Sequence, residues 1–141
     1  MKKVIISILC LSLLTGSLFV PSKAAAAENN ANLVITPMFT NINTFYNVFN
    51  IYDGGEACVD SDLIYRNADS GTIVVYLERY ITDRWIAIKS WTGTSSDREG
   101  YCSGTYYVDS GSQYRIRAYG YVYAGGKLVD STSYTSGPQY Y

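Results

Sequence analysis

The chain has 141 residues, with eleven Lys and Arg, twelve Asp and Glu, and no His, for a formal net charge of −1. The absence of His excludes Ser-His-Asp and Cys-His nucleophilic sites, imidazole zinc sites and imidazole pH switches. The near-neutral charge provides no basic field for nucleic acid, and the length fits one domain.

The first 27 residues are typical of a secretory signal peptide. Residues 1–3 are positively charged, residues 4–14 form an apolar run, and the small residues 24–27 offer a cleavage site. An uncleaved membrane anchor is the alternative, but the uninterrupted apolar run is short for a bilayer span of about 20 residues. No later segment is apolar enough to cross a membrane. We therefore expect a secreted, extracellular product that is released from the cell.

Signal cleavage would change both the charge and the cysteine count of the chain. The net charge would fall to −4, because Lys2, Lys3 and Lys23 would leave and no acid would. Cys10 would leave as well, and Cys58 and Cys102 would remain as a pair. In an exported chain such a pair usually forms one disulfide. Two free thiols with a redox or metal role are the alternative, although two Cys without His cannot complete a zinc shell without carboxylates.

From residue 32 onward, short runs rich in β-branched and aromatic residues alternate with Gly, Asp, Asn and Ser turns. No run combines a 3.6-residue period with helix caps. The pattern predicts an all-β fold, a single seven-stranded antiparallel β-sandwich over residues 41–141. An N-terminal extension over 28–40 could supply an eighth strand. The expected strands lie in the runs 32–36, 41–52, 56–65, 72–81, 85–91, 100–108, 113–124 and 128–135, with a polar loop over 93–98.

The segment from Tyr106 to Ala118 resembles the E–F corner and F strand of fibronectin type III and immunoglobulin-like domains. In those domains a Gly-containing turn precedes a Tyr-x-apolar-x-apolar strand. The resemblance implies that Tyr114 is the tyrosine-corner residue, whose hydroxyl bonds to backbone across the corner. The immunoglobulin disulfide joins strands B and F, whereas a bond between Cys58 and Cys102 would join the neighbouring strands B and E.

Residues 71–141 also resemble small secreted proteins of Gram-positive bacteria. The similarity rests on several short motifs. These are Leu77-Glu78-Arg79, the segment between Trp85 and Trp91, Tyr107-Val108 through Tyr114-Arg115, the Tyr-Val-Tyr segment 121–123 and the closing Tyr140-Tyr141. These short motifs are structural, so the resemblance implies a fold and carries over no activity.

Strand alternation predicts which side chains face the core. The inward set is Ile73, Val75, Leu77, Ile86, Ile88, Tyr114, Ile116, Ala118, Gly120 and Val122. The outward set includes Val74, Glu78, Ala87 and Lys89 together with a candidate binding face made of Tyr76, Tyr80, Trp85, Trp91, Arg115, Arg117, Tyr119, Tyr121 and Tyr123.

Tyr and Trp bury a large area with few rotatable bonds, and Arg stacks on them, so this face predicts a binding surface. Its partner would be a protein or a cell-surface glycan, because sugar rings lie flat on aromatic side chains. Two alternatives stay open. The rings could simply pair across strands and stabilise the sheet, or a homodimer could form through the aromatic face.

The sequence gives little support for an enzyme. The acids lie mostly in turns, no recognisable motif pairs Glu78 or Glu99, and small sandwiches seldom have a deep pocket. Glu56, Asp60 and Asp62 share one strand face but lack EF-hand spacing, so we expect no metal and no cofactor. A secreted, non-catalytic binding or adhesion module is the leading hypothesis. A bacteriocin-like or toxin-like effector is the alternative, although a charge of −4 does not favour membrane attack.

Overall fold

A computed structural model describes residues 40–141 as an all-β structure. The predicted signal peptide over 1–27 and almost all of the predicted extension over 28–40 lie outside the described residues. The strands are β1 (Ile42–Ile51), β2 (Glu56–Tyr65), β3 (Ser70–Ile81), β4 (Arg84–Ser95), β5 (Glu99–Tyr107), β6 (Gln113–Ala124), β7 (Lys127–Thr135) and β8 (Gln139–Tyr140).

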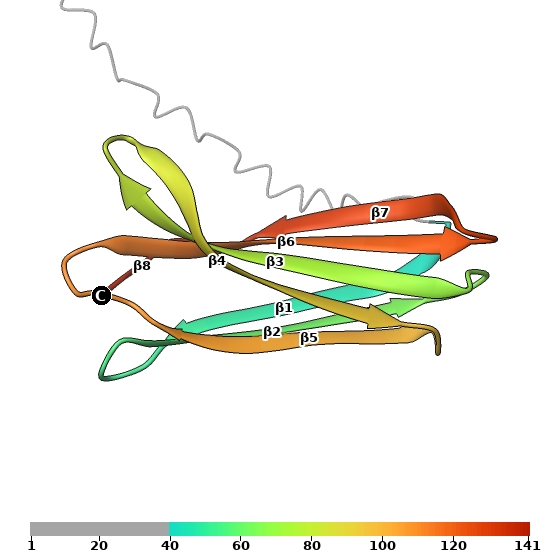
Figure 1. The fold of residues 1–141 in the computed structure, drawn as a ribbon, viewed down its shortest axis with the longest axis horizontal. Helices are drawn as coiled ribbons and strands as arrows, with labels where there is room; N and C mark the ends of the chain where they lie inside the picture. The colour runs from blue at the N-terminus through green and yellow to red at the C-terminus, as the bar shows by residue number, and fades with distance from the viewer. Residues whose placement is uncertain (1–39) are drawn as a thin grey trace, which may run out of the picture. The chain divides into compact units, whose positions relative to one another are not determined.

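The strands form two antiparallel sheets that face each other (Figure 1). Sheet A has the order β1-β2-β5, and sheet B has the order β4-β3-β6-β7, with the short β8 paired to β6. The predicted antiparallel β-sandwich is therefore confirmed. Its strand order is compatible with fibronectin type III and immunoglobulin-like domains.

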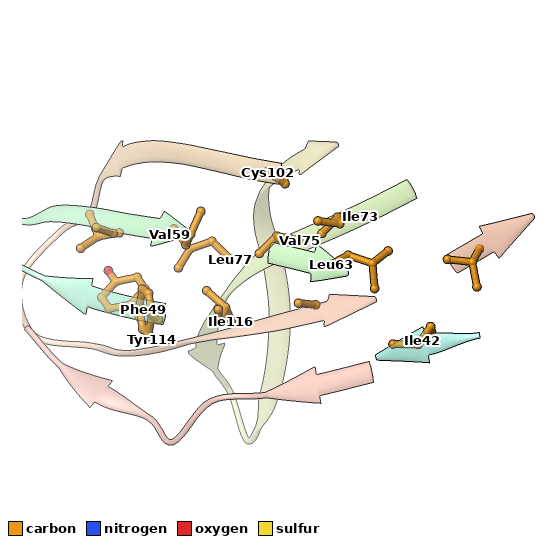
Figure 2. Packing of buried hydrophobic residues seen from close by; sticks show 14 of the residues in the cluster. Ile42, Phe49, Val59, Leu63, Ile73, Val75, Leu77, Cys102, Tyr114 and Ile116 are labelled. Atoms are coloured by element: carbon orange, nitrogen blue, oxygen red, sulfur yellow. The ribbon is translucent and has the colours of Figure 1, made fainter. Parts of the chain in front are cut away.

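The core lies between the two sheets and follows the alternation of the strands (Figure 2). Every second residue of β2, β3 and β6 is buried, as expected for strands with one face on a core. The inward set predicted for β3 and β6 is correct. The buried side chains at its centre are Val59, Leu63, Ile73, Val75, Leu77, Tyr114, Ile116 and Val122.

The corner between β5 and β6 is held by Tyr114. Its ring is buried, and its hydroxyl donates to the backbone carbonyl of Asp109 at 2.7 Å. Arg79 lies across the same corner and pairs with the Asp109 carboxylate at 3.2 Å. The hydrogen bond from Tyr114 has the form that the tyrosine-corner resemblance implies.

Two-residue turns connect the strands of sheet B at both ends. Thr82 and Asp83 join β3 to β4, and Gly125 and Gly126 join β6 to β7, all four with positive φ. Positive φ at both central positions is the signature of type I′ turns, whose twist matches that of the strands they connect. The Asp69 carboxylate accepts a hydrogen bond from the Gly125 amide and so ties the second turn to the start of β3.

The structure differs from the sequence prediction at β4 and at the C-terminus. β4 continues to Ser95, so the first half of the segment predicted as a loop over 93–98 is strand and only residues 96–98 are not. The eighth strand among residues 40–141 is β8 near the C-terminus. It was missed because it is only two residues long and has no alternation of its own. The side chain of Gln139 bonds to both the amide of Ile51 and the carbonyl of Phe49, which fixes β8 beside the end of β1.

Candidate binding face

The outer surface of sheet B is the candidate site, and we call it the tyrosine face. Because Ile116, Ala118, Gly120 and Val122 point to the core, the residues between them point outward. The cross-strand register places Arg117 opposite Tyr76 and Tyr119 opposite Val74. From the predicted set, the tyrosine face contains Tyr76, Tyr80, Trp85, Arg115, Arg117, Tyr119, Tyr121 and Tyr123.

The rings of three tyrosines contact one another across β3 and β6. Tyr119 and Tyr121 are stacked, with ring centroids 6.3 Å apart and an interplanar angle of 10°. Tyr76 meets Tyr119 edge-on, with centroids 6.1 Å apart. Both arrangements are favourable for aromatic quadrupoles, so the three rings form one connected surface.

Packing also changes the acidity of one of these phenols. Burial, with smaller contributions from neighbouring Tyr119, Tyr76 and Tyr123, raises the pKa of Tyr121. The environment therefore favours its neutral hydroxyl, which can both donate and accept a hydrogen bond.

A charged cluster lies beside the rings. Glu78 of β3 is only 1% exposed, and its two carboxylate oxygens meet two guanidinium groups. One oxygen accepts from Nε of Arg115 at 2.8 Å, and the other lies 2.7 Å from Nη2 of Arg117. Two positive charges against one negative charge leave the cluster with a net charge of +1.

Aromatic rings fix the positions of both guanidinium groups. The Arg115 guanidinium lies over the ring of Trp85 at 4.3 Å, and that of Arg117 lies 5.8 Å from the ring of Tyr119. Trp85 in turn contacts Tyr80, with centroids 5.1 Å apart. Stacked, ion-paired guanidiniums lose little further side-chain freedom when a ligand binds.

The sequence contains no motif that identifies the partners of Glu78, and the structure gives it two. Arg115 lies directly opposite Glu78, and Arg117 lies on the diagonal. Cross-strand pairing of this kind could have been found by aligning β3 with β6 in antiparallel register, since opposite charges favour facing positions.

The edge strands surround the tyrosines with small hydroxyl side chains. On β4 these are Ser90 and Thr92, opposite Tyr76 and Val74. On β7 they face Arg117, Tyr119 and Tyr121. The surface is therefore aromatic in the centre and hydroxyl-rich at the rim, through Ser90, Thr92, Ser131, Ser133 and Thr135.

Trp91 was predicted to lie on the tyrosine face, and that prediction is wrong. A β-bulge between Leu77 and Glu78 adds one residue to β4, which reverses the alternation beyond it. Trp91 therefore pairs with inward-facing Val75 and packs against the core. Its indole lies directly on Gly104 of β5, where any Cβ would collide with the ring.

The bulge also decides which other predictions for β4 are correct: those before it are, and the one for Lys89 after it is not. Trp85 and Ala87 precede it and pair with outward-facing Tyr80 and Glu78, as expected. Lys89 was predicted to face outward, but it pairs with the inward-facing Leu77 at the exposed edge of the sheet.

The expected disulfide between Cys58 and Cys102 does not form, because both are free thiols. Cys102 lies opposite Ser61, three residues from Cys58 along β2. Since strand side chains alternate, an offset of three places the two cysteines on opposite faces of sheet A. Their Cβ atoms point apart, which prevents a disulfide.

Burial raises the pKa of the Cys102 thiol. Burial, together with the nearby carboxylates of Glu56 and Asp60, raises the pKa of the Cys58 thiol.

The tyrosine face is shallow. An open hollow of about 240 Å³ lies at its β4 edge, lined by Tyr76, Ala87, Ile88, Lys89 and Ser90. Within residues 40–141, no three Cys, Asp or Glu side chains gather closely enough to hold a metal ion. The same part of the chain contains no helix long and apolar enough to cross a membrane.

Comparison with protein-family models gives no match to this sequence, and comparison with curated proteins gives none either.

Proposed function

We propose that the chain is a secreted, non-catalytic binding or adhesion module that holds its partner on the tyrosine face. The partner is a protein or a cell-surface glycan. The proposal includes a fibronectin type III-like domain as the scaffold and export directed by residues 1–27.

The observation that carries this proposal is the continuity of the face. The aromatic surface formed by Tyr76, Tyr119 and Tyr121 adjoins guanidinium groups that are already fixed by Glu78. Tyr and Arg are enriched at binding hot spots, and rigid side chains lose little entropy on association. Flat rings with a hydroxyl rim suit a flat partner.

A non-catalytic role is supported by the state of the acid on this face. General acid-base catalysis needs a carboxyl group that can exchange a proton with a substrate. Both oxygens of Glu78 are occupied by arginines, and the side chain is buried. Glu78 therefore positions the guanidinium groups and makes no contact with a ligand.

The experiment is capture of the purified protein by cell-wall preparations, whole cells and glycan arrays. The test variant is Tyr119→Thr/Tyr121→Thr, because Thr removes the rings and keeps strand propensity. The control is Tyr52→Thr, which removes an exposed ring that lies outside every strand. We expect a surface or glycan to retain the wild type and the control and to lose the test variant. Equal retention of all three proteins, or of none, would overturn the proposal.

A further inference from the structure

The two sheets carry opposite charge. β1, β2 and β5 contain four acidic residues and no Lys or Arg, so the strands of sheet A sum to −4. β3, β4, β6 and β7 contain six basic and two acidic residues, so the strands of sheet B sum to +4. Of these charges, Glu78, Arg115 and Arg117 lie on the outer surface of the sheet, which therefore carries +1. The sandwich is therefore polarised from one sheet to the other.

The outer surface of sheet A, which we call the acidic face, holds all four of those acids. Ala57, Val59, Ser61 and Leu63 are buried, so the residues between them on β2 point outward. Exposed tyrosines lie among the acids, and the hydroxyl of Tyr101 donates to Asp60 at 2.6 Å. The face contains Glu56, Asp60, Asp62, Glu99, Tyr46, Tyr101 and Tyr107.

The tyrosine face has unused donors that suit these acids. Arg115 donates its Nε–H to Glu78, and Arg117 pairs with Glu78 through Nη2. Among residues 40–141, the remaining guanidinium nitrogens of both arginines have no side-chain acceptor. Guanidinium groups bind carboxylates well because they offer several N–H groups in a fixed plane.

We propose that the acidic face of one copy docks on the tyrosine face of a second copy. The inference rests on the proposed function, because it uses the same face and names a second copy of the chain as its partner. Carboxylates of Asp60 and Asp62 meet the free N–H groups of Arg115 and Arg117, and tyrosines on both faces pack between them.

Charge disfavours the two symmetric alternatives. A two-fold dimer through the tyrosine face would bring Arg115 and Arg117 against their own copies. A two-fold dimer through the acidic face would oppose four acids with four acids. Only the contact between unlike faces joins opposite charges. Because these faces lie on opposite sides of one sandwich, the contact is heterologous, does not close on itself, and generates chains of copies.

The size of the faces predicts a weak contact. Ten-residue strands are about 33 Å long, and three strands span about 10 Å between the outer two, which gives a few hundred Å² per copy. Stable interfaces bury about 800 Å² per partner. The association should therefore need high protein concentration and should weaken as salt screens the charges.

The test is sedimentation velocity of the protein expressed from its full-length sequence, in reductant so that Cys58 cannot cross-link copies. Concentrations run from about 10 μM to about 500 μM, at about 0.02 M and about 0.5 M salt. At low salt, the weight-average mass should rise more than about twofold over this range. At high salt it should return to that of the monomer.

Two charge reversals make the test specific. Arg117→Glu and Asp62→Lys should each stay monomeric alone, because each opposes like charges across the contact. An equimolar mixture should assemble again, because each variant keeps one native face and the two altered faces now complement each other. Lys127→Glu is the control, since it makes the same charge change at the β6–β7 turn and should assemble like the wild type. If Arg117→Glu does not fold, Ser133→Glu puts a negative charge on the same face from β7.

Three results would overturn the inference: a wild type that is monomeric at low salt and the highest concentration, a mass that levels off at a dimer, or assembly that survives Asp62→Lys. A monomeric wild type that a surface or glycan still retains through Tyr119 and Tyr121 would leave the proposed function standing. A monomeric wild type that nothing retains would remove both.

Discussion

Glu78 shows how one buried residue organises a sheet face. Its position would be unfavourable for a lone carboxylate, because burial removes hydration from the charged form. Two arginines from the neighbouring strand compensate and are held in place in return. The side chain thus belongs to the tyrosine face without being accessible to a ligand.

Glu78→Gln should destabilise the fold by about 2 kcal/mol. Breaking a fully buried ion pair costs about 3–5 kcal/mol, and we expect less here because Arg115 and Arg117 are partly exposed and keep some hydration. Urea unfolding measures the loss. Glu99→Gln is the control, because Glu99 is an exposed acid with no ion pair among the described residues. Equal stability of the two variants would contradict the account of Glu78.

The two cysteines should react separately. Cys58 is partly exposed and Cys102 is buried, so a thiol reagent should label Cys58 in the native protein and Cys102 only after unfolding. Because the raised pKa of Cys58 favours the protonated thiol, its labelling rate should keep rising at pH values where an ordinary cysteine has levelled off. Mass spectrometry without reductant counts the labels. An unfolded chain that carries no label would mean that Cys58 and Cys102 are joined in a disulfide.

At the scale of single strands, β4 links the two sheets. Its bulge turns Trp91 inward, and the indole covers β5 at the open side of the sandwich. This contact depends on Gly104, whose missing side chain makes room for the ring.

Gly104→Ala should therefore destabilise the protein, by about 1–3 kcal/mol, since the added methyl group overlaps Trp91 and forces it to move. Thermal unfolding followed by tryptophan fluorescence measures the effect. Gly137→Ala is the matched control, because a Cβ there meets nothing within 4 Å and the backbone is not left-handed. A Gly104→Ala protein as stable as the control would show that β4 does not pack on β5 in this way.

The sequence predicted β1 to β7 and the two sides of β3 and β6, where inward and outward side chains alternate along the strand. It could not place Trp91, since a bulge depends on how β4 pairs with β3 and leaves no local pattern. The disulfide prediction failed for a related reason: strand alternation puts Cys58 and Cys102 on opposite faces only when the register of β2 against β5 is known. Most of the tyrosine face was predictable, whereas its charged cluster required the pairing of β3 with β6.

At the scale of the whole molecule, the sandwich keeps two different surfaces apart. One sheet presents acids and tyrosines, and the other presents tyrosines and arginines, while a continuous apolar core separates them. Changes on one outer face should therefore leave both the core and the other face intact.

The central claim is that the rings of the tyrosine face serve binding and do not hold the sheet together. Its most direct test is the free energy of unfolding of Tyr119→Thr/Tyr121→Thr, measured in urea beside Ile116→Ala on the same strand. Cross-strand aromatic pairs contribute about 0.2–1 kcal/mol each, whereas removing a buried Ile side chain costs about 2–5 kcal/mol. We predict that the double variant loses less than half as much stability as Ile116→Ala. A loss equal to that of Ile116→Ala would contradict the claim and assign the rings to the stability of the sheet.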